Sequence, residues 1–140
     1  MINWSEALLK EYGYQIGNSL IESANLSMEN YGSLDMTLCL SGQVNVCFGG
    51  YVLGKGYLGA KDDFWKGSAA GLEYIMRIMD VVGVECFQDL KGKYVRVAYK
   101  GFGSRVKIIG NITKEKWFDA ESFFKDKKEN ENEKETQRVN

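Results

Sequence analysis

Residues 34–48 read LDMTLCLSGQVNVCF and predict two β-strands joined by a tight turn. Apolar side chains recur at every second position in residues 34–40 and again in residues 44–48, and Ser41-Gly42 separates the two runs. A period of two is typical of a strand with one buried face, and a glycine between two such runs marks a turn. Because residues 20–28 show the same alternation, the three runs together predict an antiparallel meander.

A central helix is predicted after the glycine-rich loop of residues 49–67. Ser68 can cap its start, and Gly83 follows its last residue, Val82. The helix carries two apolar faces, which we call the first stripe (Leu72, Ile75, Met76, Met79 and Val82) and the second stripe (Tyr74, Ile78 and Val81). Because one sheet can cover only one apolar face of a helix, we expect the second stripe to contact another subunit, with coverage by the N-terminal helix as the alternative.

Shorter elements complete the predicted fold. They are a helix over residues 5–11 capped by Asn3, a hairpin with strands 94–100 and 105–112, and a helix over residues 120–124. The fold class is α+β: an antiparallel β-sheet, made of the N-terminal meander plus the C-terminal hairpin, packed on one central helix, with short N- and C-terminal helices. We expect a single domain over residues 1–127 and a disordered charged tail over residues 128–140, which has little apolar surface to bury.

The composition narrows the range of functions. The 140 residues include no histidine and no proline, and the formal net charge is -1. Without histidine, no Ser-His or Cys-His nucleophile pair and no His-bearing metal site can form, which favours a binding protein over an enzyme and predicts neither metal nor cofactor. The balanced charge argues against DNA, RNA or an anionic membrane surface as a partner.

The cysteines and the ends of the chain indicate the compartment. Cys39, Cys47 and Cys86 are odd in number and lack C-x-x-C spacing, which is typical of a reducing compartment where each thiol acts as a small apolar residue. No apolar run reaches the roughly 20 residues that span a bilayer, and the N-terminus lacks the pattern of a signal peptide. We therefore expect a cytoplasmic protein.

Two glycine-rich runs are candidate ligand sites. Residues 54–59, GKGYLG, match a dinucleotide-binding spacing, but the predicted helix begins too far along the chain to hold a pyrophosphate. The alternatives are a loop whose backbone approaches some other anion and, as the more ordinary explanation, a plain flexible connection. Paired glycines at the end of the third strand let a ligand approach the main chain, and the aromatic residues beside them either stack on a flat ring or, as aromatic residues more often do, fill the core. This second run is Phe48-Gly49-Gly50-Tyr51.

Charged and polar residues supply the other candidates. The guanidinium of Arg77 suits a phosphate, with an ion pair to Glu73 or Asp80 as the alternative. Arg96 and Arg105, on facing strands, either contact a ligand or are ordinary charges on the sheet surface.

The hairpin offers two further candidates. Phe102 lies between two glycines at the hairpin tip, where a ligand ring or a partner subunit could bury it. Asn111 either hydrogen-bonds the ligand or closes a turn, with the turn as the ordinary explanation. Asp62 and Asp63 are the only basis for a third interpretation, a small enzyme acting on a nucleotide, and no second group places them in a common pocket.

Several runs, in their order and spacing, resemble one family of small phage proteins. They are FGGY at residues 48–51, GLEYIMRIM at 71–79, VGVE at 82–85, DLKGKYVR at 89–96, and IGNI at 109–112 followed by KWF at 116–118. The similarity extends from about residue 18 to residue 124 and is to the first-described family of phage anti-Thoeris nucleotide sponges. The N-terminal helix and the tail lie outside it.

The resemblance implies a non-enzymatic sponge in the host cytoplasm. Such a protein binds a cyclic ADP-ribose-type signal without cleaving it and blocks Thoeris immunity, and members that also hold cyclic oligonucleotides block CBASS immunity. The family forms homodimers or higher homo-oligomers with pockets at subunit contacts. By position, Arg77 would meet a phosphate, Phe102 would stack on adenine, Asn111 would hydrogen-bond the ligand, and residues 48–51 would line the pocket.

A second interpretation is a protein-binding inhibitor of a host defence complex, of the anti-CRISPR or anti-restriction type. Such proteins usually present a strongly acidic surface or a large exposed apolar patch. The net charge of -1 disfavours the acidic surface and leaves the apolar patch to be sought in the structure.

Overall fold

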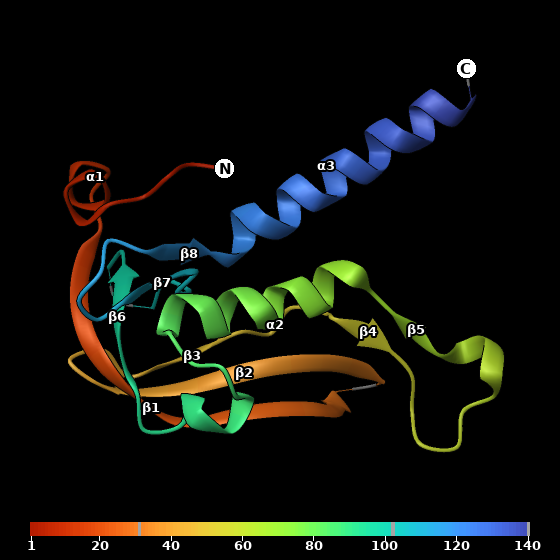
Figure 1. The fold of residues 1–140 in the computed structure, drawn as a ribbon, viewed down its shortest axis with the longest axis horizontal. Coiled ribbons are helices and arrows are strands. Elements are labelled where there is room, and N and C mark those ends of the chain that lie inside the picture. Colours follow the sequence, from red (N-terminus) through yellow and green to blue (C-terminus); the bar gives the residue numbers. More distant parts are fainter. Residues whose placement is uncertain (31, 102, 140) are drawn as a thin grey trace.

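One long strand, β1 (Gln15–Asn30), joins the two halves of an eight-stranded antiparallel sheet (Figure 1). The computed structural model describes every residue except 31, 102 and 140, and every side chain except those and residues 30 and 135–139. The strand order is β5-β4-β2-β1-β6-β7-β8, with β3 also pairing with β2. The other strands are β2 (Ser33–Gly42), β3 (Val46–Phe48), β4 (Gly54–Lys55), β5 (Lys66–Gly67), β6 (Tyr94–Tyr99), β7 (Ile108–Asn111) and β8 (Trp117–Asp119).

The predicted α+β class and the antiparallel meander are confirmed, with different strand boundaries. The first strand begins at Gln15 rather than near residue 20, because its first six residues pair with β6. The third strand is only three residues long, since Val44 belongs to the turn before it. The second strand of the C-terminal hairpin begins at Ile108 rather than Arg105, and β8, which the sequence analysis missed, pairs with it.

The central helix α2 (Ala69–Val82) begins and ends where the sequence predicts. The Ser68 hydroxyl accepts a hydrogen bond from the Gly71 amide at 2.9 Å, and Gly83 follows the helix with φ of +91°, a conformation that favours glycine. The Ser68 hydroxyl also donates to the Leu53 carbonyl at 2.9 Å. This bond ties the start of α2 to the strand segment before β4.

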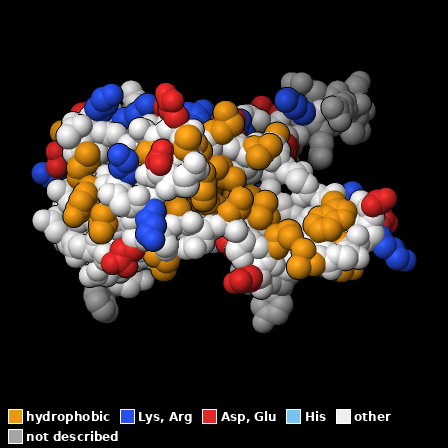
Figure 2. All heavy atoms as spheres, turned by 60° about the horizontal axis from the view of Figure 1, so that its bottom comes forward, with side chains coloured by type: hydrophobic (Ala, Val, Ile, Leu, Met, Phe, Trp, Pro, Cys, Tyr) orange, Lys and Arg blue, Asp and Glu red, His pale blue; other side chains and the backbone are white. Residues whose placement is uncertain are grey.

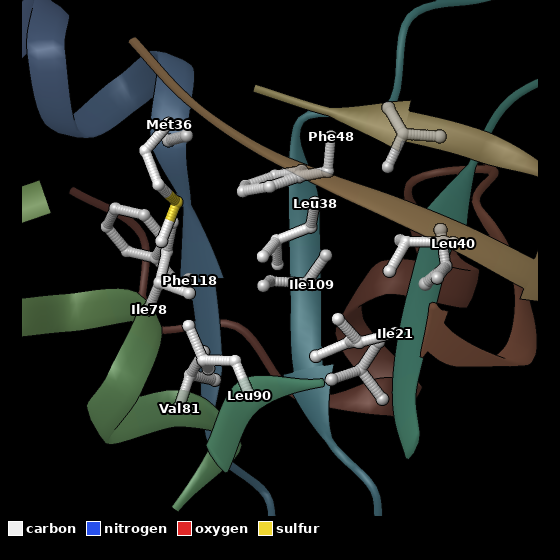
Figure 3. Packing of buried hydrophobic residues seen from close by; sticks show 14 of the residues in the cluster. Ile21, Met36, Leu38, Leu40, Phe48, Ile78, Val81, Leu90, Ile109 and Phe118 are labelled. Carbon is white, nitrogen blue, oxygen red and sulfur yellow. The ribbon is translucent and has the colours of Figure 1, made fainter. Parts of the chain in front are cut away.

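The side of α2 that the chain buries is the second stripe. Tyr74, Ile78 and Val81 are buried in one cluster with strand residues, as Figure 3 shows for Ile78 and Val81 together with residues of β1, β2, β3 and β7. In the first stripe, Leu72 is 67% exposed and Met76 66% exposed. The expectation that the second stripe contacts another subunit is therefore wrong, because that stripe packs on the chain's own sheet. In the first stripe, Leu72 and Met76 stay exposed, whereas Ile75, Met79 and Val82 are half-buried against the core.

The N-terminal helix α1 (Glu6–Glu11) covers the opposite face of the sheet. Leu9 and Trp4 pack against Ala98 and Ile108 in a second apolar cluster. The neighbours of those strand residues, Val97 and Ile109, belong to the main cluster, and successive side chains of a strand point to opposite faces. Helix α1 therefore leaves Leu72 and Met76 of the first stripe exposed, and its cap is Ser5 rather than Asn3.

The C-terminal helix α3 (Ala120–Val139) is longer than expected. As predicted, Asp119 caps its start by accepting a hydrogen bond from the Ser122 amide at 3.1 Å. The helix then continues through residues 128–139, for which the sequence analysis predicts disorder, and Figure 1 shows it running away from the sheet. Glutamate and lysine are good helix formers, and they extend a helix whose first turns are already fixed by packing of Phe123 and Phe124.

Residues 56–65 form an arm that projects beyond β2 (Figure 1). The arm contains the short helix η1 (Asp62–Phe64), and a second short helix, η2 (Phe87–Leu90), follows α2. The ring of Trp65 covers Gly56, where a Cβ would lie 2.3 Å from a ring carbon, and Tyr57 packs edge-on against Phe64. Within the described part of the chain, no helix is both long and apolar enough to cross a membrane.

The two stripes of α2 give a stability prediction. Replacing the buried Ile78 by alanine should lower the free energy of unfolding by about 2–5 kcal/mol, because it leaves a cavity in the core. Replacing the exposed Met76 by alanine should change it by less than about 0.5 kcal/mol. Urea denaturation of both variants at the same low protein concentration measures the difference, and equal losses would contradict the burial of the second stripe.

Candidate functional site

A groove of about 730 Å³ lies where β1 begins. At this point β1 is flanked on one side by the turn between β2 and β3 and on the other by the loop between β6 and β7. The residues that line it are Gln15, Gln43, Val44, Asn45, Val46, Cys47, Tyr99, Gly101, Gly103, Ser104, Arg105 and Val106. Its volume is within the range of about 300–1,000 Å³ that is typical of small-molecule sites.

The first wall is the turn between β2 and β3, which buried hydrogen bonds hold in place. Ser19 of β1 is fully buried, and its hydroxyl donates to the Val44 carbonyl at 2.6 Å and accepts from the Val44 amide. The Gln43 side chain accepts from the Asn18 amide at 2.7 Å. These bonds fix the turn against β1, so the groove is formed before any ligand binds.

The second wall includes Arg105, which joins two loops. Its guanidinium donates to the Gly49 carbonyl at 2.7 Å and lies 4.5 Å from the centre of the Tyr51 ring. Both contacts are with uncharged groups, and no carboxylate within 4.0 Å of Arg105 is found among the described residues. Arg105 is exposed, so its positive charge is available to an anion in the groove.

The glycine corner behind Arg105 depends on close backbone contact. A Cβ on Gly49, whose φ is +139°, would lie 2.5 Å from the Met36 carbonyl oxygen. Tyr51 stacks on Phe124 with 5.0 Å between ring centres, and burial raises the pKa of its hydroxyl despite the nearby Arg105. That hydroxyl is buried without a hydrogen-bond partner among the described residues. The corner is therefore a rigid support for Arg105.

The lining offers several kinds of contact to a small polar molecule. Gln15 carries an amide that can donate and accept hydrogen bonds, and Tyr99 adds an aromatic ring. The amide oxygens of Gln43 and Asn45 already accept from the backbone amides of Asn18 and Gly42, so these two residues offer mainly N–H groups. Among the lining residues that the structure describes, Arg105 is the one cation and none is a carboxylate. This combination suits an uncharged polar ring with an anionic group, which is the chemistry of a nucleotide.

None of the three cysteines is fully buried, in contrast to the expectation that each thiol acts as a small apolar residue. Cys47 is exposed and lines the groove, and its Sγ lies 3.8 Å from that of Cys39 on the neighbouring strand. Hydrogen bonding to Cys39 raises the pKa of Cys47, with burial and charge adding to the effect. Cys86, after α2, is exposed as well.

The structure brings four of the sequence-predicted site residues together. They are Gly49, Gly50, Tyr51 and Arg105, of which Arg105 lines the groove itself. Phe48 lies behind them in the core, with its ring stacked 6.5 Å from that of Tyr74 (Figure 3). Phe102 lies outside the described residues, and its neighbours Gly101 and Gly103 both line the groove.

Arg96 lies elsewhere, as part of a buried network. Its Nε donates to the Asn111 carbonyl at 2.7 Å, and its Nη1 lies 3.0 Å from a Glu115 carboxylate oxygen. The guanidinium also lies 4.4 Å from the centre of the Trp117 ring. Arg96 therefore fastens the turn between β7 and β8, and this single chain does not present it to the groove.

Asn111 closes that turn and joins it to α2. Its Oδ1 accepts hydrogen bonds from the amides of Thr113 and Lys114 at 3.0 and 2.9 Å. Its Nδ2 donates at 3.0 Å to the carbonyl of Val81, one of the last carbonyls of the helix, which have no partner within the helix itself. The turn is the ordinary role that the sequence analysis considers for this residue.

Arg77 lies on the solvent side of α2, outside the groove lining. Its guanidinium pairs with Glu73 at 3.2 Å, and Asp80, the other partner considered, pairs with Lys116 at 2.7 Å. Asp62 and Asp63 are exposed on the arm, also away from the groove. The ligand-binding roles that the resemblance implies for Arg77 and Asn111 remain predictions.

Sequence reasoning missed most of the groove. Gln15, Gln43 and Asn45 look like ordinary polar residues at strand ends, and Tyr99 looks like part of a hairpin. No local signal marks Ser19 as the residue that holds the turn, because it follows Gly17 and Asn18 in a stretch without an apolar run. Nothing in the sequence shows that the starts and ends of three separate strands meet.

Comparisons of the chain with models of protein families, with curated proteins and with solved structures find no match.

The positions of Asn111 and Arg105 predict different effects of substitution on stability. Asn111→Ala should cost about 2–3 kcal/mol of unfolding free energy, because it leaves buried groups of the turn and of α2 without partners. Arg105→Ala should cost at most about 1 kcal/mol, because it removes one exposed hydrogen bond and one ring contact. Thermal and urea unfolding measure both, and a stable Asn111→Ala protein would contradict the structural role.

Glu115 makes the stability sensitive to acid. Hydrogen bonds from the Glu6 amide, the Trp117 indole and Arg96 hold the pKa of Glu115 below its ordinary value of 4.5. The stabilisation is present above that ordinary value and is lost as the pH falls through the lowered pKa. The melting temperature of Glu115→Gln should therefore decline less than that of the unaltered protein as the pH falls below 4.5. Parallel curves in a thermal melt series would show that Glu115 does not contribute.

Proposed function

We propose that the protein is a nucleotide sponge, which holds a small anionic nucleotide in the groove at the start of β1 and does not cleave it. The observation that carries the proposal is the groove itself: about 730 Å³ of space with three side-chain amides and Arg105, for whose charge the described residues supply no carboxylate within 4.0 Å. A guanidinium binds phosphate through two parallel hydrogen bonds, and amides match the edges of a base or the hydroxyls of a ribose.

The rigidity of the groove supports sequestration. Ser19, Gln43 and Arg105 fix both walls through hydrogen bonds to backbone groups. A preformed site loses little conformational entropy when its ligand binds, and this favours tight retention. Lining residues without a carboxylate offer no obvious general base, and a sponge has no need of one.

The resemblance to anti-Thoeris sponges names a ligand class, cyclic ADP-ribose isomers and related cyclic nucleotides. The function would then be to block Thoeris immunity, and CBASS immunity for a cyclic oligonucleotide, in the cytoplasm of a phage-infected host. We include a homodimer or higher homo-oligomer in the proposal, because the first stripe of α2 exposes Leu72 and Met76 in the single chain.

Ligand retention tests the proposal and locates the site. The protein is mixed with cyclic ADP-ribose isomers, freed of unbound ligand, and heat-denatured, and the released nucleotide is analysed by mass spectrometry. We expect intact ligand in an amount stoichiometric with protein. Released product of altered mass, or no released nucleotide with any isomer, would contradict the proposal.

Two arginine variants form a matched pair for the same assay. Arg105→Ala should weaken binding by about 10- to 100-fold, because a charge-assisted hydrogen bond is worth about 1.5–3 kcal/mol. Arg77→Ala, which removes an exposed arginine paired with Glu73, should leave the affinity unchanged if the groove is the site. The reverse result would place the ligand at the position that the family resemblance implies. Phe102→Ala tests the predicted stacking residue in the same way.

The second interpretation, a protein-binding inhibitor, has one observation in its favour. Hydrophobic side chains gather in a band across the face shown in Figure 2 and extend onto the arm. The exposed large hydrophobic residues of α2 and of the segment around the arm are Val52, Tyr57, Leu58, Phe64, Trp65, Leu72 and Met76. Recovery of one stoichiometric host protein that is lost in a Leu58→Ser, Trp65→Ser variant would favour this interpretation over the sponge.

A further inference from the structure

The second half of β1 has an open edge. Strand β6 pairs with β1 only from Gln15 to Leu20, and the backbone of Ile21 exchanges hydrogen bonds with Gly92 and Lys93. From Glu22 onward, no strand in the described part of the chain pairs with β1 on the side opposite β2. Figure 1 shows this half of β1 at the boundary of the sheet, beyond η2.

The register shows which backbone groups face the open edge. The Leu34 carbonyl of β2 accepts a hydrogen bond from the Leu53 amide, which lies on the side of β2 opposite β1. The backbone amides and carbonyls of Leu34 and of every second residue after it therefore point away from β1. Met36 and Leu38 are therefore in non-hydrogen-bonded pairs with Leu26 and Ala24. The amides and carbonyls of Ala24 and Leu26 consequently point outward, away from β2, and Met28 follows them within the register shift between Ser27 and Asn30.

This edge lacks most of the devices that keep strand edges apart, although β1 has a register shift at each end of the segment, between Ile21 and Ser23 and between Ser27 and Asn30. Natural edge strands usually carry lysine, proline or an inward-pointing charge. Residues 23–28, SANLSM, contain none of these, and the charges nearest to them are Glu22 and Glu29 at the two ends. Leu26, in the middle, is 50% exposed. An apolar, uncharged edge with free backbone groups is a surface for strand addition.

We propose that this edge binds the same edge of a second copy of the chain, by antiparallel pairing of β1 centred on Leu26. Leu26 then lies opposite Leu26 of the second copy, and Ala24 lies opposite Met28 in both directions. The Leu26 pair forms two hydrogen bonds, because the outward-pointing backbone groups of both strands meet there in a hydrogen-bonded pair. The result is one continuous sheet across a two-fold axis.

The charges fit a second copy better than another strand. In the register centred on Leu26, Glu29 lies opposite Ser23 and Glu22 lies opposite Asn30, so that no two carboxylates face each other. A shift of the centre to between residues 25 and 26 would set the outward-pointing residues of each strand opposite residues whose backbone groups face β2, so no hydrogen-bonded pairs would form. The two glutamates would also repel an acidic strand from another protein.

The same pairing brings further apolar surface to the contact. Leu26 and Ala24 lie on the face of the sheet that carries α2, since their partners Met36 and Leu38 belong to the main core. A two-fold axis through the Leu26 pair places both α2 helices on this face of the joined sheet. Leu72 and Met76, which the single chain leaves exposed, then lie in the shared layer and add to the area that a stable dimer needs.

This inference deepens the homo-oligomer part of the proposed function and is independent of the ligand. Sedimentation and light scattering of the full chain without nucleotide measure the mass directly. We expect a dimer for the unaltered protein and a monomer for Leu26→Pro, because proline removes an outward amide that β2 does not use. The fold should survive, with an unchanged circular dichroism spectrum.

A second variant guards against a folding defect in the proline variant. Leu26→Lys keeps the backbone amide and places two lysines opposite each other only in the proposed register, so it too should be monomeric. Asn25→Ala, on the other face of the same strand, is the matched control and should stay dimeric. A monomeric unaltered protein, or a dimer that persists in both Leu26 variants, would overturn the proposal.

A cross-link tests the register itself. Leu26→Cys should form a disulfide-linked dimer on mild oxidation, because only a residue on the two-fold axis faces itself. Leu58→Cys, which is 88% exposed on the arm, is the control and should not exceed the unaltered protein, whose own cysteines give the background. Equal cross-linking of the two variants would exclude this register.

The same variants separate this proposal from the ligand proposal. If Leu26→Lys is monomeric and retains nucleotide, the groove is complete in one chain and both proposals stand. If the unaltered protein is dimeric by this edge but retains no nucleotide, the sponge proposal fails alone.

Discussion

The sharing of β1 between two strands is the constraint on which the remaining features depend. Its first half pairs with β6 and its second half with β2, and the register shift between Ile21 and Ser23 marks the change. At the start of β1, the ends of both partner strands lie on either side of it, and the loops that leave them form the groove. At the other end only β2 remains, so one edge of β1 stays open.

Tertiary structure assigns different roles to three residues of one type, Arg77, Arg96 and Arg105. Arg96 is buried and has carboxylate and carbonyl partners, so its charge is satisfied inside the protein. Arg77 is exposed beside Glu73, an arrangement that contributes little to stability. Among the described residues, Arg105 has a backbone carbonyl and an aromatic ring as its partners and no carboxylate within 4.0 Å. An anion gains most at the arginine that no carboxylate neutralises.

The groove and the apolar surfaces make different physical demands on a partner. The groove is preformed and polar, with walls held by hydrogen bonds between side chains and backbone, and it suits a small rigid ligand. The first stripe of α2 and the open edge of β1 offer apolar area and unpaired backbone groups, and these suit another polypeptide. A homo-oligomeric sponge uses both kinds of surface, whereas a protein-binding inhibitor uses only the second.

Local patterns in the sequence determine the central helix with its Ser68 and Gly83 caps, the three strands of the meander and the α+β class, because caps, turns and periodicity depend on residues near in the chain. The paired glycines of residues 48–51 also indicate a backbone conformation that other residues rarely adopt, and Gly49 and Gly50 both have a positive φ. Only the tertiary structure decides which stripe of α2 is buried, which arginine keeps an unpaired charge and which edge of β1 stays open. These depend on contacts between residues far apart in the chain, such as Asn111 with Val81 and Arg105 with Gly49, and such contacts leave no periodic signal in a single sequence.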